Sequence, residues 1–462
     1  MSVERTIPYG DGFVGVRLPE RTRVISPGTA LDLGPAGDLA ALVRRALDDP
    51  IDRPPLREQV RSGDRVTVAF DDPTVPCYAP LWPVALSMIV EDLERGGVAT
   101  SDISLICANA LHRQFTHDEL SKLIGPELVA AHSDRLHCHD AEDERMIVHL
   151  GTTGSGHSVD VSRRVVDSDL TVYLNCSTMR GFSGGWKSVC VGLSSYSSIH
   201  HHHTPDTMSM SLDRNKMHEI LDEMGAVVDR ELGDERIFKL ETVLADPLTV
   251  HDICSGSVRE TRRAVVDKLR RKQPARRALT DERFDIVVYG VPDWSPYAAF
   301  SHGNPILDLV STGLGYLGGM IQAVGSPGCT VVIANPCPKR FNETHHPSYV
   351  EVWEEVLPGT TDPDEARRRY EPDLAARADY IDAYRHANAF HPTHAIMALY
   401  PLKRLRHAGR VVVAGAQDAS VPERCSFEPA ASVEDAVADA EDIHGKDAGV
   451  ALIDYPMAFN RQ

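Results

Sequence analysis

A lysine behind a loop of small residues, with four histidines just beyond it, is the feature of this 462-residue chain most suited to chemistry. Lys187 closes the run Gly181-Phe182-Ser183-Gly184-Gly185-Trp186-Lys187, and His200 to His203 follow 13 to 16 residues later. Small residues let a backbone approach a bulky ligand closely. A lysine amine can bond covalently to a ligand or bind phosphate, and imidazoles are common nickel, zinc and copper ligands. The alternative is a glycine turn with a surface lysine and a solvated histidine loop.

Short apolar runs alternate with amphipathic segments, which predicts an α/β fold. Residues 83–95 carry apolar side chains at helical spacing and precede Gly96-Gly97, a typical helix stop. The apolar runs suit strands buried on both faces of a parallel sheet. Strands are expected at 65–70, 103–108, 170–174, 285–290, 329–334 and 410–415, a further helix at 308–324, and an exposed charged helical segment at 360–384.

The basic and polar stretch 260–283 is predicted to be a helix end and linker. It divides the chain into an N-terminal cofactor-binding and catalytic domain, residues 1–270, and a C-terminal α/β domain, residues 280–462. Both domains are expected to contain mostly parallel sheets. Because ligands commonly bind at domain interfaces, we expect the active site in the cleft between them.

Polar residues follow three of the predicted strands. Asp72 comes just after 65–70, His112 follows 103–108, and the 177–187 loop follows 170–174. In open α/β sheets, ligands bind beyond the carboxyl ends of the strands. These three segments are therefore expected to lie at one edge of the N-terminal sheet.

Composition excludes several classes of protein. The chain is 42% hydrophobic and 25% charged, as is usual for a globular protein, and its net charge is −19. Such an acidic chain is a poor ligand for a phosphate backbone, so no nucleic-acid partner is expected. No apolar run reaches membrane-spanning length, and the N-terminus lacks the apolar core of a signal peptide. The expected location is cytoplasmic, without a membrane partner.

The nine cysteines are odd in number and include no Cys-x-x-Cys pair, so neither a disulfide framework nor a structural zinc site is expected. Most are predicted to be small buried apolar residues. Four lie near the proposed site segments and are candidates to line it: Cys77, Cys138, Cys176 and Cys190.

An ordered series of segments resembles the nickel-dependent lactate racemase family, whose members use a nickel-pincer nucleotide. The resemblance covers residues 5–205 well and the remainder loosely, and the Gly-Phe-Ser-Gly-Gly-x-Lys loop is its most specific single piece. The other segments, in order, are Ile7-Pro8-Tyr9-Gly10, residues 45–51, Asp71-Asp72-Pro73-Thr74-Val75-Pro76, Leu111-His112-Arg113, His139-Asp140-Ala141 and Gly151-Thr152-Thr153.

The resemblance implies a role for each matching residue. Lys187 would attach the cofactor, pyridinium-3,5-bisthiocarboxylic acid mononucleotide nickel, and His203 would bind nickel, with His200, His201 and His202 as competitors. Asp72 and Thr74 would bind the cofactor, while backbone N–H groups around Ser183, Gly184 and Gly185 would hold its phosphate. His112 would remove the substrate's hydroxyl proton, for which the near-neutral pKa of histidine is suited. The alternative for His112 is a structural hydrogen bond at a strand end.

The chain also departs from the family at positions that contact substrate. Ser177 stands where the family has its second catalytic histidine, and Val75 replaces the arginine that clamps the substrate carboxylate. His137, His139, His201 and His202 are candidate substitute bases, and Arg113 and Arg180 candidate substitute clamps. The family's Tyr-Gln-x-x-Lys segment has no counterpart in residues 296–306, where His302 and Asn304 are the candidate polar contacts.

The prediction is a racemase or epimerase acting at the 2-hydroxy carbon of a hydroxy acid or related compound, by hydride transfer to the nickel-pincer nucleotide, with His112 and Ser177 as catalytic candidates. A larger or less acidic substrate than lactate is expected, such as a sugar acid, an aryl hydroxy acid or an amide. The expected partners are this substrate and the cofactor maturation enzymes, and a homo-oligomer is compatible with the sequence. The alternatives are an oxidoreductase using the same cofactor without racemisation, a non-catalytic nickel-binding protein, and a metal hydrolase. The sequence contains no His-Glu-x-x-His motif, which argues against the metal hydrolase.

Overall fold

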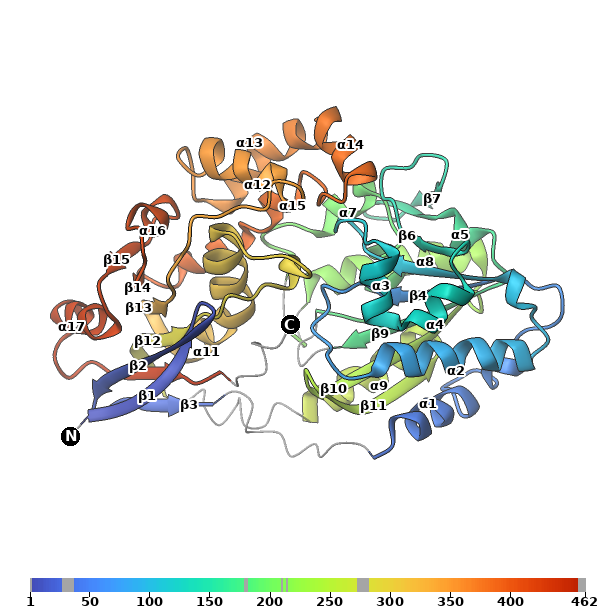
Figure 1. The fold of residues 1–462 in the computed structure, drawn as a ribbon, viewed down its shortest axis with the longest axis horizontal. Coiled ribbons are helices and arrows are strands. Elements are labelled where there is room, and N and C mark those ends of the chain that lie inside the picture. Colours follow the sequence, from blue (N-terminus) through green and yellow to red (C-terminus); the bar gives the residue numbers. More distant parts are fainter. Residues whose placement is uncertain are drawn as a thin grey trace. The chain divides into compact units, whose positions relative to one another are not determined.

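The chain divides into two compact units, each described here by itself from a computed structural model (Figure 1). The structure describes residues 2–26, 37–177, 182–208, 211–212, 215–271 and 282–455. One unit, which we call the loop unit because it contains the lysine loop, comprises Leu33–Lys272 and Tyr384–Asn388. The other, the terminal unit, comprises Met1–Asp32, Gln273–Ala383 and Ala389–Gln462.

A six-stranded sheet forms the centre of the loop unit, with strand order β11-β10-β9-β4-β5-β6. All neighbouring strands are parallel except β10 and β11, which are antiparallel. The three strands expected from the first half of the sequence are confirmed as β4, β5 and β9. The strand bounds are β4 Val66–Asp71, β5 Ile103–Ala108, β6 Leu136–Cys138, β9 Leu170–Ser177, β10 Ile237–Asp246 and β11 Thr249–Gly256.

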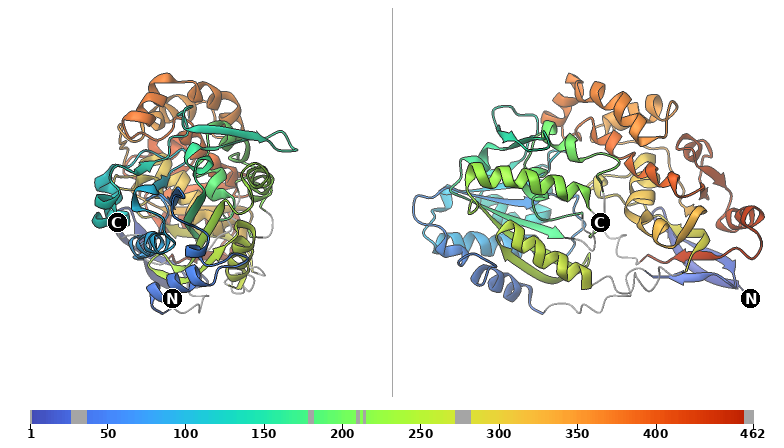
Figure 2. Two further views of the ribbon diagram at one scale, coloured as in Figure 1. Left: turned by 90° about the vertical axis from the view of Figure 1, so that its right-hand side faces the viewer. Right: turned by 180° about the vertical axis from the view of Figure 1, so that it is seen from behind.

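Helices cover both faces of this sheet (Figure 2). Alternate apolar side chains of the strands pack on one face against α1, α2, α3 and α4 in a single core, so the helix expected at 83–95 is confirmed as part of α2. The other face carries α6, α8 and α9. The bounds are α1 Leu39–Asp48, η1 Leu56–Glu58, α2 Leu81–Arg95, η2 Thr100–Asp102, α3 His117–Ile124, α4 Pro126–Ala131, α5 Arg163–Val166, α6 Lys187–Cys190, α7 Tyr196–His202, α8 Lys216–Leu232 and α9 Val258–Arg271; β7 Ile147–Thr152 and β8 Ser158–Ser162 form a hairpin.

The terminal unit contains a second six-stranded sheet, in which every neighbouring pair is parallel. Its order is β15-β14-β13-β12-β16-β3, and the expected strands at 285–290, 329–334 and 410–415 are confirmed as β12, β13 and β14. The bounds are β1 Ser2–Tyr9, β2 Gly12–Pro19, β3 Arg23–Ile25, β12 Phe284–Gly290, β13 Gly325–Ala334, β14 Arg410–Ala414, β15 Glu428–Ala430 and β16 Val450–Ile453. Two mostly parallel sheets confirm the predicted α/β class.

The helix expected at 308–324 begins as a π-helical segment rather than an α-helix. The charged segment expected at 360–384 forms two α-helices, α13 and α14. The bounds are η3 Pro296–Ala298, η4 Ile306–Leu317, η5 Gly318–Met320, α11 Ile321–Val324, α12 Pro347–Glu351, η6 Val352–Val356, α13 Pro363–Ala375, α14 Ala378–His386, α15 His394–Met397, η7 Tyr400–Arg406, α16 Ser420–Arg424 and α17 Val433–His444.

The observed grouping differs from the expected domains, 1–270 and 280–462, at the N-terminus. β3 pairs with β16, and the apolar side chains of the β1–β2 hairpin join the core of the terminal sheet. Backbone pairing and apolar packing therefore group β1, β2 and β3 with the second half of the chain. The active-site cleft between the two domains stays a prediction.

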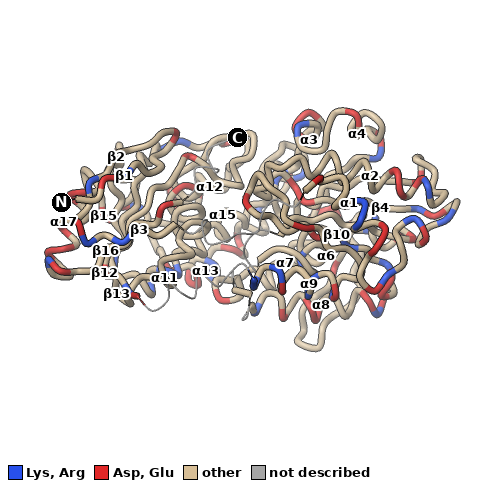
Figure 3. Tube along the Cα trace, turned by 90° about the horizontal axis from the view of Figure 1, so that it is seen from below, with Lys and Arg blue, Asp and Glu red and all other residues tan. Residues whose placement is uncertain are grey.

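Charged residues of both signs are interspersed along the trace of each unit (Figure 3). Within the residues that the structure describes, no helix is long and apolar enough to cross a membrane.

Candidate active site

The carboxyl ends of three neighbouring parallel strands carry the residues singled out from the sequence. β4 ends at Asp71 and is followed by Asp72, β5 leads into the loop that contains His112, and β9 ends at Ser177. β4 lies between β5 and β9, so the three segments meet at one edge of the sheet, as expected.

His112 is oriented by a buried carboxylate. Its Nδ1 lies 2.8 Å from Oδ2 of Asp72, and Thr74 donates its hydroxyl hydrogen to Oδ1 of the same carboxylate at 2.6 Å. The Asp72 side chain is 3% exposed, whereas that of His112 is 22% exposed. Because the carboxylate accepts from Nδ1–H, Nε2 of the neutral imidazole is left as the proton acceptor. This is the arrangement of an oriented general base.

The backbone after β5 turns sharply to present His112. The His112 N–H donates to the Asn109 carbonyl at 2.7 Å, and Ala110 adopts a left-handed conformation with φ of +49°. The Asn109 side chain donates to the His112 carbonyl at 3.0 Å and accepts the His139 N–H at 2.8 Å. Side-chain and backbone hydrogen bonds therefore both hold the turn that carries the imidazole.

Lys187 is the first residue of α6, directly after the glycine loop. Its ammonium nitrogen lies 4.4 Å from the centre of the Phe182 ring, a cation–π contact. Burial lowers the pKa of the Lys187 amine, and the Asp71 and Asp72 carboxylates oppose part of this shift. Among the described residues, no carboxylate lies within ion-pair distance of this amine. A desolvated amine with a lowered pKa is more nucleophilic at neutral pH.

The loop before Lys187 is held by residues of α8, α9 and β10. His218 Nε2 lies 3.2 Å from the Phe182 carbonyl, and the Arg262 guanidinium donates to the Ser183 carbonyl. The Gly185 N–H donates to Glu241 Oε2 at 3.0 Å. This amide, expected from the sequence to hold a phosphate, therefore already has a carboxylate partner.

Gly184 must be glycine in this loop. It adopts φ of +91°, and an added Cβ would lie 1.9 Å from Oε1 of Glu241. Both the backbone conformation and the close approach of the carboxylate exclude a side chain.

Gly184→Ala is expected to lower the free energy of unfolding by about 3 kcal/mol, because it combines left-handed strain with a clash against a buried carboxylate. Chemical denaturation of the purified variant measures the change. Gly154→Ala is the control, since an added Cβ there meets nothing within 4 Å. A Gly184→Ala variant as stable as the Gly154→Ala control would contradict the observed seating of the loop.

Ser177, predicted as a catalytic residue, is fully buried and bonded to a carboxylate. Its hydroxyl donates to Glu241 Oε1 at 2.7 Å. The serine hydrogen is thereby committed to a structural partner rather than presented at the surface of the site. This contact disfavours Ser177 as a direct replacement for the family's second histidine.

The histidine run splits into two pairs at the end of α7. His202 and His203 are buried, and their Nδ1 atoms lie 2.9 Å apart. The His200 and His201 rings are partly exposed and lie 4.0 Å apart between centroids. Burial, followed by the charge of Lys187, lowers the pKa of His202 to about 3. His202 is therefore neutral near pH 7 and lies within the electrostatic range of Lys187.

A buried aspartate anchors the start of the histidine helix. Asp160 Oδ2 accepts the hydroxyl of Ser195, the N-cap of α7, at 2.6 Å and that of Ser197 at 2.5 Å. Its Oδ1 accepts from His149 Nδ1 at 2.7 Å. The serine hydroxyls and His149 lower the pKa of Asp160 against the desolvation that would raise it. The carboxylate thus stays ionised and fixes the helix that ends in His202.

No group of three or more His, Cys, Asp or Glu side chains in the described part of the chain is arranged to hold a metal ion. The nine cysteines are unpaired thiols and eight of them are buried, Cys138 being the partly exposed one. The expectation that most cysteines are buried is therefore confirmed.

Two of the candidate substitute bases lie on or beside β6 of the loop unit, His139 buried and His137 partly buried. His139 is 2% exposed, and its Nε2 lies 2.8 Å from the Ser194 carbonyl. Burial lowers the pKa of His139 and that of His137, each to about 4. His139 is therefore held as a structural donor to the backbone before α7.

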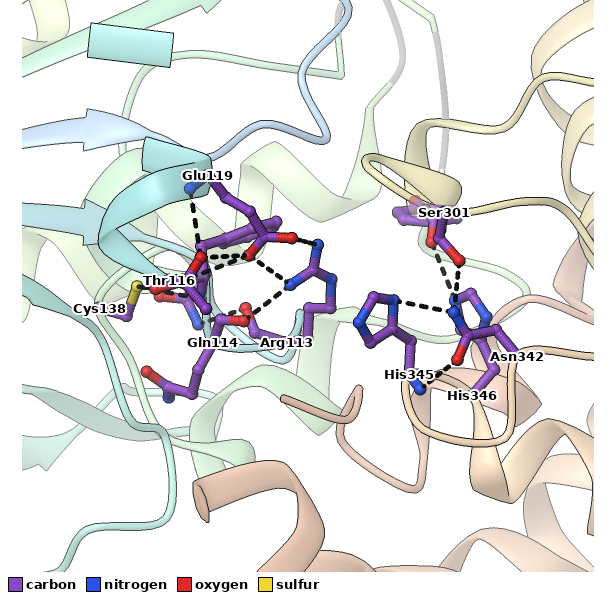
Figure 4. Close-up of polar contacts among 12 residues, drawn as sticks. Arg113, Gln114, Thr116, Glu119, Cys138, Ser301, Asn342, His345 and His346 are labelled. Atoms are coloured by element: carbon purple, nitrogen blue, oxygen red, sulfur yellow. Dashed lines mark hydrogen bonds and ion pairs between the residues drawn. The ribbon is translucent and has the colours of Figure 1, made fainter. Parts of the chain in front are cut away.

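Arg113, a candidate carboxylate clamp, is occupied by an internal partner (Figure 4). It is 1% exposed and forms a two-pronged ion pair with Glu119, at 3.0 and 2.7 Å. Its guanidinium also lies 4.3 Å from the Phe115 ring centre. Arg113 is thus committed to the capping box of α3 and does not present an open clamp. Arg180, the other candidate, lies outside the described residues.

The polar candidates of the terminal unit have local partners. The Asn304 side chain is fully buried and accepts the Leu307 N–H at 3.0 Å, at the start of η4, while His302 Nδ1 lies 2.9 Å from the Gly303 carbonyl. Ser301, the residue before His302, belongs to a separate polar group. The Asn342 side chain donates to the Ser301 hydroxyl at 2.7 Å and lies 3.3 Å from His345 Nδ1 (Figure 4). Asn304 Oδ1 thus supports the start of η4, whereas its Nδ2 is buried without a hydrogen-bond partner among the described residues, and the contact of Asn304 with a ligand stays a prediction.

Several charged residues near the lysine loop were missed from the sequence. Burial raises the pKa of Asp71 to about 6, and burial lowers that of Lys239 to about 8. Lys239 donates to the Ser188 hydroxyl and lies 4.5 Å from the Tyr173 ring centre. The available signal was the alternation of Lys239 and Glu241 with apolar residues in one strand, which marks a polar face on β10.

Taken together, the fold and the site define an α/β protein with an oriented histidine and a desolvated lysine at the carboxyl edge of a parallel sheet. Residues 9–214 match the lactate racemase N-terminal domain family. This match covers less than half of the chain and shows that its N-terminal part is similar to the lactate racemase family.

Two curated relatives bear the name lactate racemase. The protein of Lactiplantibacillus plantarum is 26% identical over 187 residues, which cover 38% of this chain and 42% of the relative. The protein of Thermoanaerobacterium thermosaccharolyticum is 24% identical over 222 residues, covering 46% and 51%. The chain thus matches about half the length of each curated relative.

The structure of the lactate racemase apoprotein from T. thermosaccharolyticum has a TM-score of 0.69 to this chain. The alignment covers 100% of this chain and 99% of that chain, at 17% sequence identity. This similarity establishes a shared fold.

Proposed function

We propose that this protein is a racemase or epimerase that acts at the 2-hydroxy carbon of a hydroxy acid or related compound. The observation that carries the proposal is Asp72, which accepts a hydrogen bond from His112 and acts electrostatically on Lys187. One buried carboxylate thereby links the proposed base to the proposed point of cofactor attachment. The similarity of the chain to proteins named lactate racemase supports the same reaction class.

The residues present fit a nickel-pincer nucleotide. Lys187 provides a desolvated amine for covalent attachment, and His203 provides an imidazole on the segment that Asp160 anchors. Gly184 and Gly185 adopt φ of +91° and +57° and have no side chains, so the loop backbone is uncovered at these two positions. When bound, this cofactor would supply a reversible acceptor for the hydride on the substrate's 2-carbon.

In the proposed reaction, His112 Nε2 takes the hydroxyl proton of the substrate and later returns it. Asp72 holds the ring in the required tautomer and stabilises the imidazolium that forms, and Thr74 holds Asp72. The Asp72 carboxylate is buried, so its interaction with the imidazolium is weakly screened by water.

We propose a substrate other than lactate. Val75 replaces the family's clamping arginine, and Arg113 is bound to Glu119. A site without these guanidinium contacts loses the two-pronged recognition that a small carboxylate requires. A sugar acid, an aryl hydroxy acid or a hydroxy amide would gain binding energy from contacts elsewhere.

A second candidate function follows from the Ser177–Glu241 hydrogen bond. With the serine hydrogen committed to Glu241, His112 is the one oriented base described at this edge of the sheet. An oxidoreductase that uses the same cofactor would pass the hydride on to a second acceptor and release a ketone, and it would need a base on only one face of the substrate.

The test is product analysis with protein produced alongside the cofactor maturation enzymes. Single enantiomers of lactate, an aryl hydroxy acid, a sugar acid and a hydroxy amide are incubated separately, and both chirality and ketone are measured. We expect inversion of at least one larger substrate, about tenfold or more faster than lactate. Ketone without inversion would support the oxidoreductase, and no reaction of any substrate by nickel-loaded protein would contradict both functions.

A further inference from the structure

Glu241 is a fully buried carboxylate on the polar face of β10. Both of its oxygens accept hydrogen bonds, Oε1 from Ser177 at 2.7 Å and Oε2 from the Gly185 N–H at 3.0 Å. Arg262 Nη1 lies 3.5 Å from Oε1 and compensates the charge. Two hydrogen bonds and one ion pair offset the cost of burying this carboxylate, which would be high without them.

The contacts of Glu241 and its neighbours converge on one short segment. They engage the carbonyl of Phe182, the carbonyl of Ser183 and the N–H of Gly185. Gly184, between these contacts, lies against the carboxylate so closely that an added Cβ would meet it at 1.9 Å. Three of the four loop residues from 182 to 185 are thus hydrogen-bonded to side chains from β10, α8 and α9, and the fourth is seated on Glu241.

We propose that Glu241 is a positioning residue that sets the conformation of the 182–185 loop and thereby the position of the Lys187 amine. The role for cofactor attachment rests on the proposed function, whereas the role in ordering the loop does not. The Ser177 hydroxyl acts in this assembly as a donor to Glu241. Ser177 is therefore part of the loop support, which explains how a serine occupies the place of a catalytic histidine without a partner base.

The carboxylate suits this position because it accepts from the Ser177 hydroxyl and the Gly185 N–H and carries the charge opposite Arg262. Glu241→Gln has nearly the same shape but exchanges one acceptor oxygen for an NH₂ group. That group would face either the Ser177 hydroxyl or the Gly185 N–H, and the charge opposite Arg262 would be lost. An NH₂ group facing Gly185 removes the hydrogen bond that links the loop to the sheet, whereas one facing Ser177 keeps that bond but still leaves Arg262, which holds the Ser183 carbonyl, without its counter-charge.

The test is hydrogen–deuterium exchange of the full chain without cofactor, followed in peptides that cover residues 182–190. We expect exchange of the loop amides about tenfold faster in Glu241→Gln than in the unchanged protein. Asp92→Asn is the matched control, because Asp92 is also a buried carboxylate of the loop unit, paired with Arg44 at 2.6 Å, but lies on α2. It should leave loop exchange unchanged. Equal loop exchange in Glu241→Gln and the unchanged protein would overturn the proposal.

A second variant covers the case in which Glu241→Gln fails to fold. Arg262, whose side chain is 16% exposed, donates to the Ser183 carbonyl, and Arg262→Gln removes this contact without burying an uncompensated amide beside Gly185. We expect faster exchange in the same loop peptides. Unchanged exchange in this variant would likewise overturn the proposal.

Cofactor attachment is then measured by intact mass in protein made with the maturation enzymes. We expect the adduct on Glu241→Gln to fall about tenfold relative to Asp92→Asn. If the unchanged protein carries no adduct, the proposed function fails while loop exchange still decides the role of Glu241. Adduct at the unchanged level, despite faster exchange, would remove the link between loop order and lysine position.

Discussion

Lys187→Ala is expected to abolish the covalent adduct and the nickel of protein produced with the cofactor maturation enzymes. The amine of Lys187 is desolvated, and burial lowers its pKa, so more of it is unprotonated near neutral pH than for an ordinary lysine. Only the free amine can form the bond. Intact mass and metal analysis measure the adduct and nickel, which we expect at about one per chain in the unchanged protein and at background in the variant.

Lys187→Arg separates attachment from charge. A guanidinium retains the positive charge and can keep the contact with the Phe182 ring, but it is not a nucleophile at neutral pH. We therefore expect no adduct with Lys187→Arg either. Lys446→Ala is the control, because this exposed lysine is paired with Asp442 in the terminal unit, and its pKa is raised by that contact.

Nickel that persists without Lys187 would contradict the proposed cofactor. It would mean that the histidine run binds the metal by itself, as a nickel-binding protein would.

The position of the site could be predicted because strand ends are visible in the sequence. Continuous apolar runs end at Asp71 and Ala108, and parallel strands bring their carboxyl ends to one edge. Asp72 and His112 were therefore expected near each other. Their direct hydrogen bond could not be predicted, because it depends on the left-handed conformation of Ala110 and the turn that follows.

The support of the lysine loop could not be predicted, because it joins residues far apart in the chain. Ser177 and Glu241 are separated by 64 positions and become neighbours only when β9 pairs with β10. In the sequence, Ser177 is an ordinary residue at the end of a strand and Glu241 an ordinary residue in the middle of one. Their partnership also changes the interpretation of Ser177 from an acid/base candidate to a structural donor.

The grouping of the N-terminal strands with the terminal unit could not be predicted for a similar reason. β3 contains three residues and has no periodic pattern of its own, yet it extends the terminal sheet by pairing with β16. Sequence patterns report local preference, whereas this assignment follows from pairing between the two ends of the chain.

His112→Asn is expected to lower kcat for the best substrate by about 10²- to 10⁴-fold, while the adduct and nickel remain. The variant keeps a polar side chain at the turn but has no group that can take a proton near neutral pH. Rates are measured by chiral analysis at equal nickel content. Full activity in this variant would mean that His112 only stabilises the loop after β5.

Substitution of Asp72 tests whether the main role of this residue is to orient His112 or to bind the cofactor. Asp72→Asn removes the acceptor that fixes the imidazole tautomer, and we expect a loss in kcat of about 10²-fold. If Asp72 acts through His112, combining Asp72→Asn with His112→Asn should cost no more than His112→Asn alone, because the second change has nothing left to orient. If Asp72 instead binds the cofactor, as the family resemblance implies, the losses should multiply and the nickel content should fall. The buried 2.8 Å contact between the two side chains favours the non-additive result.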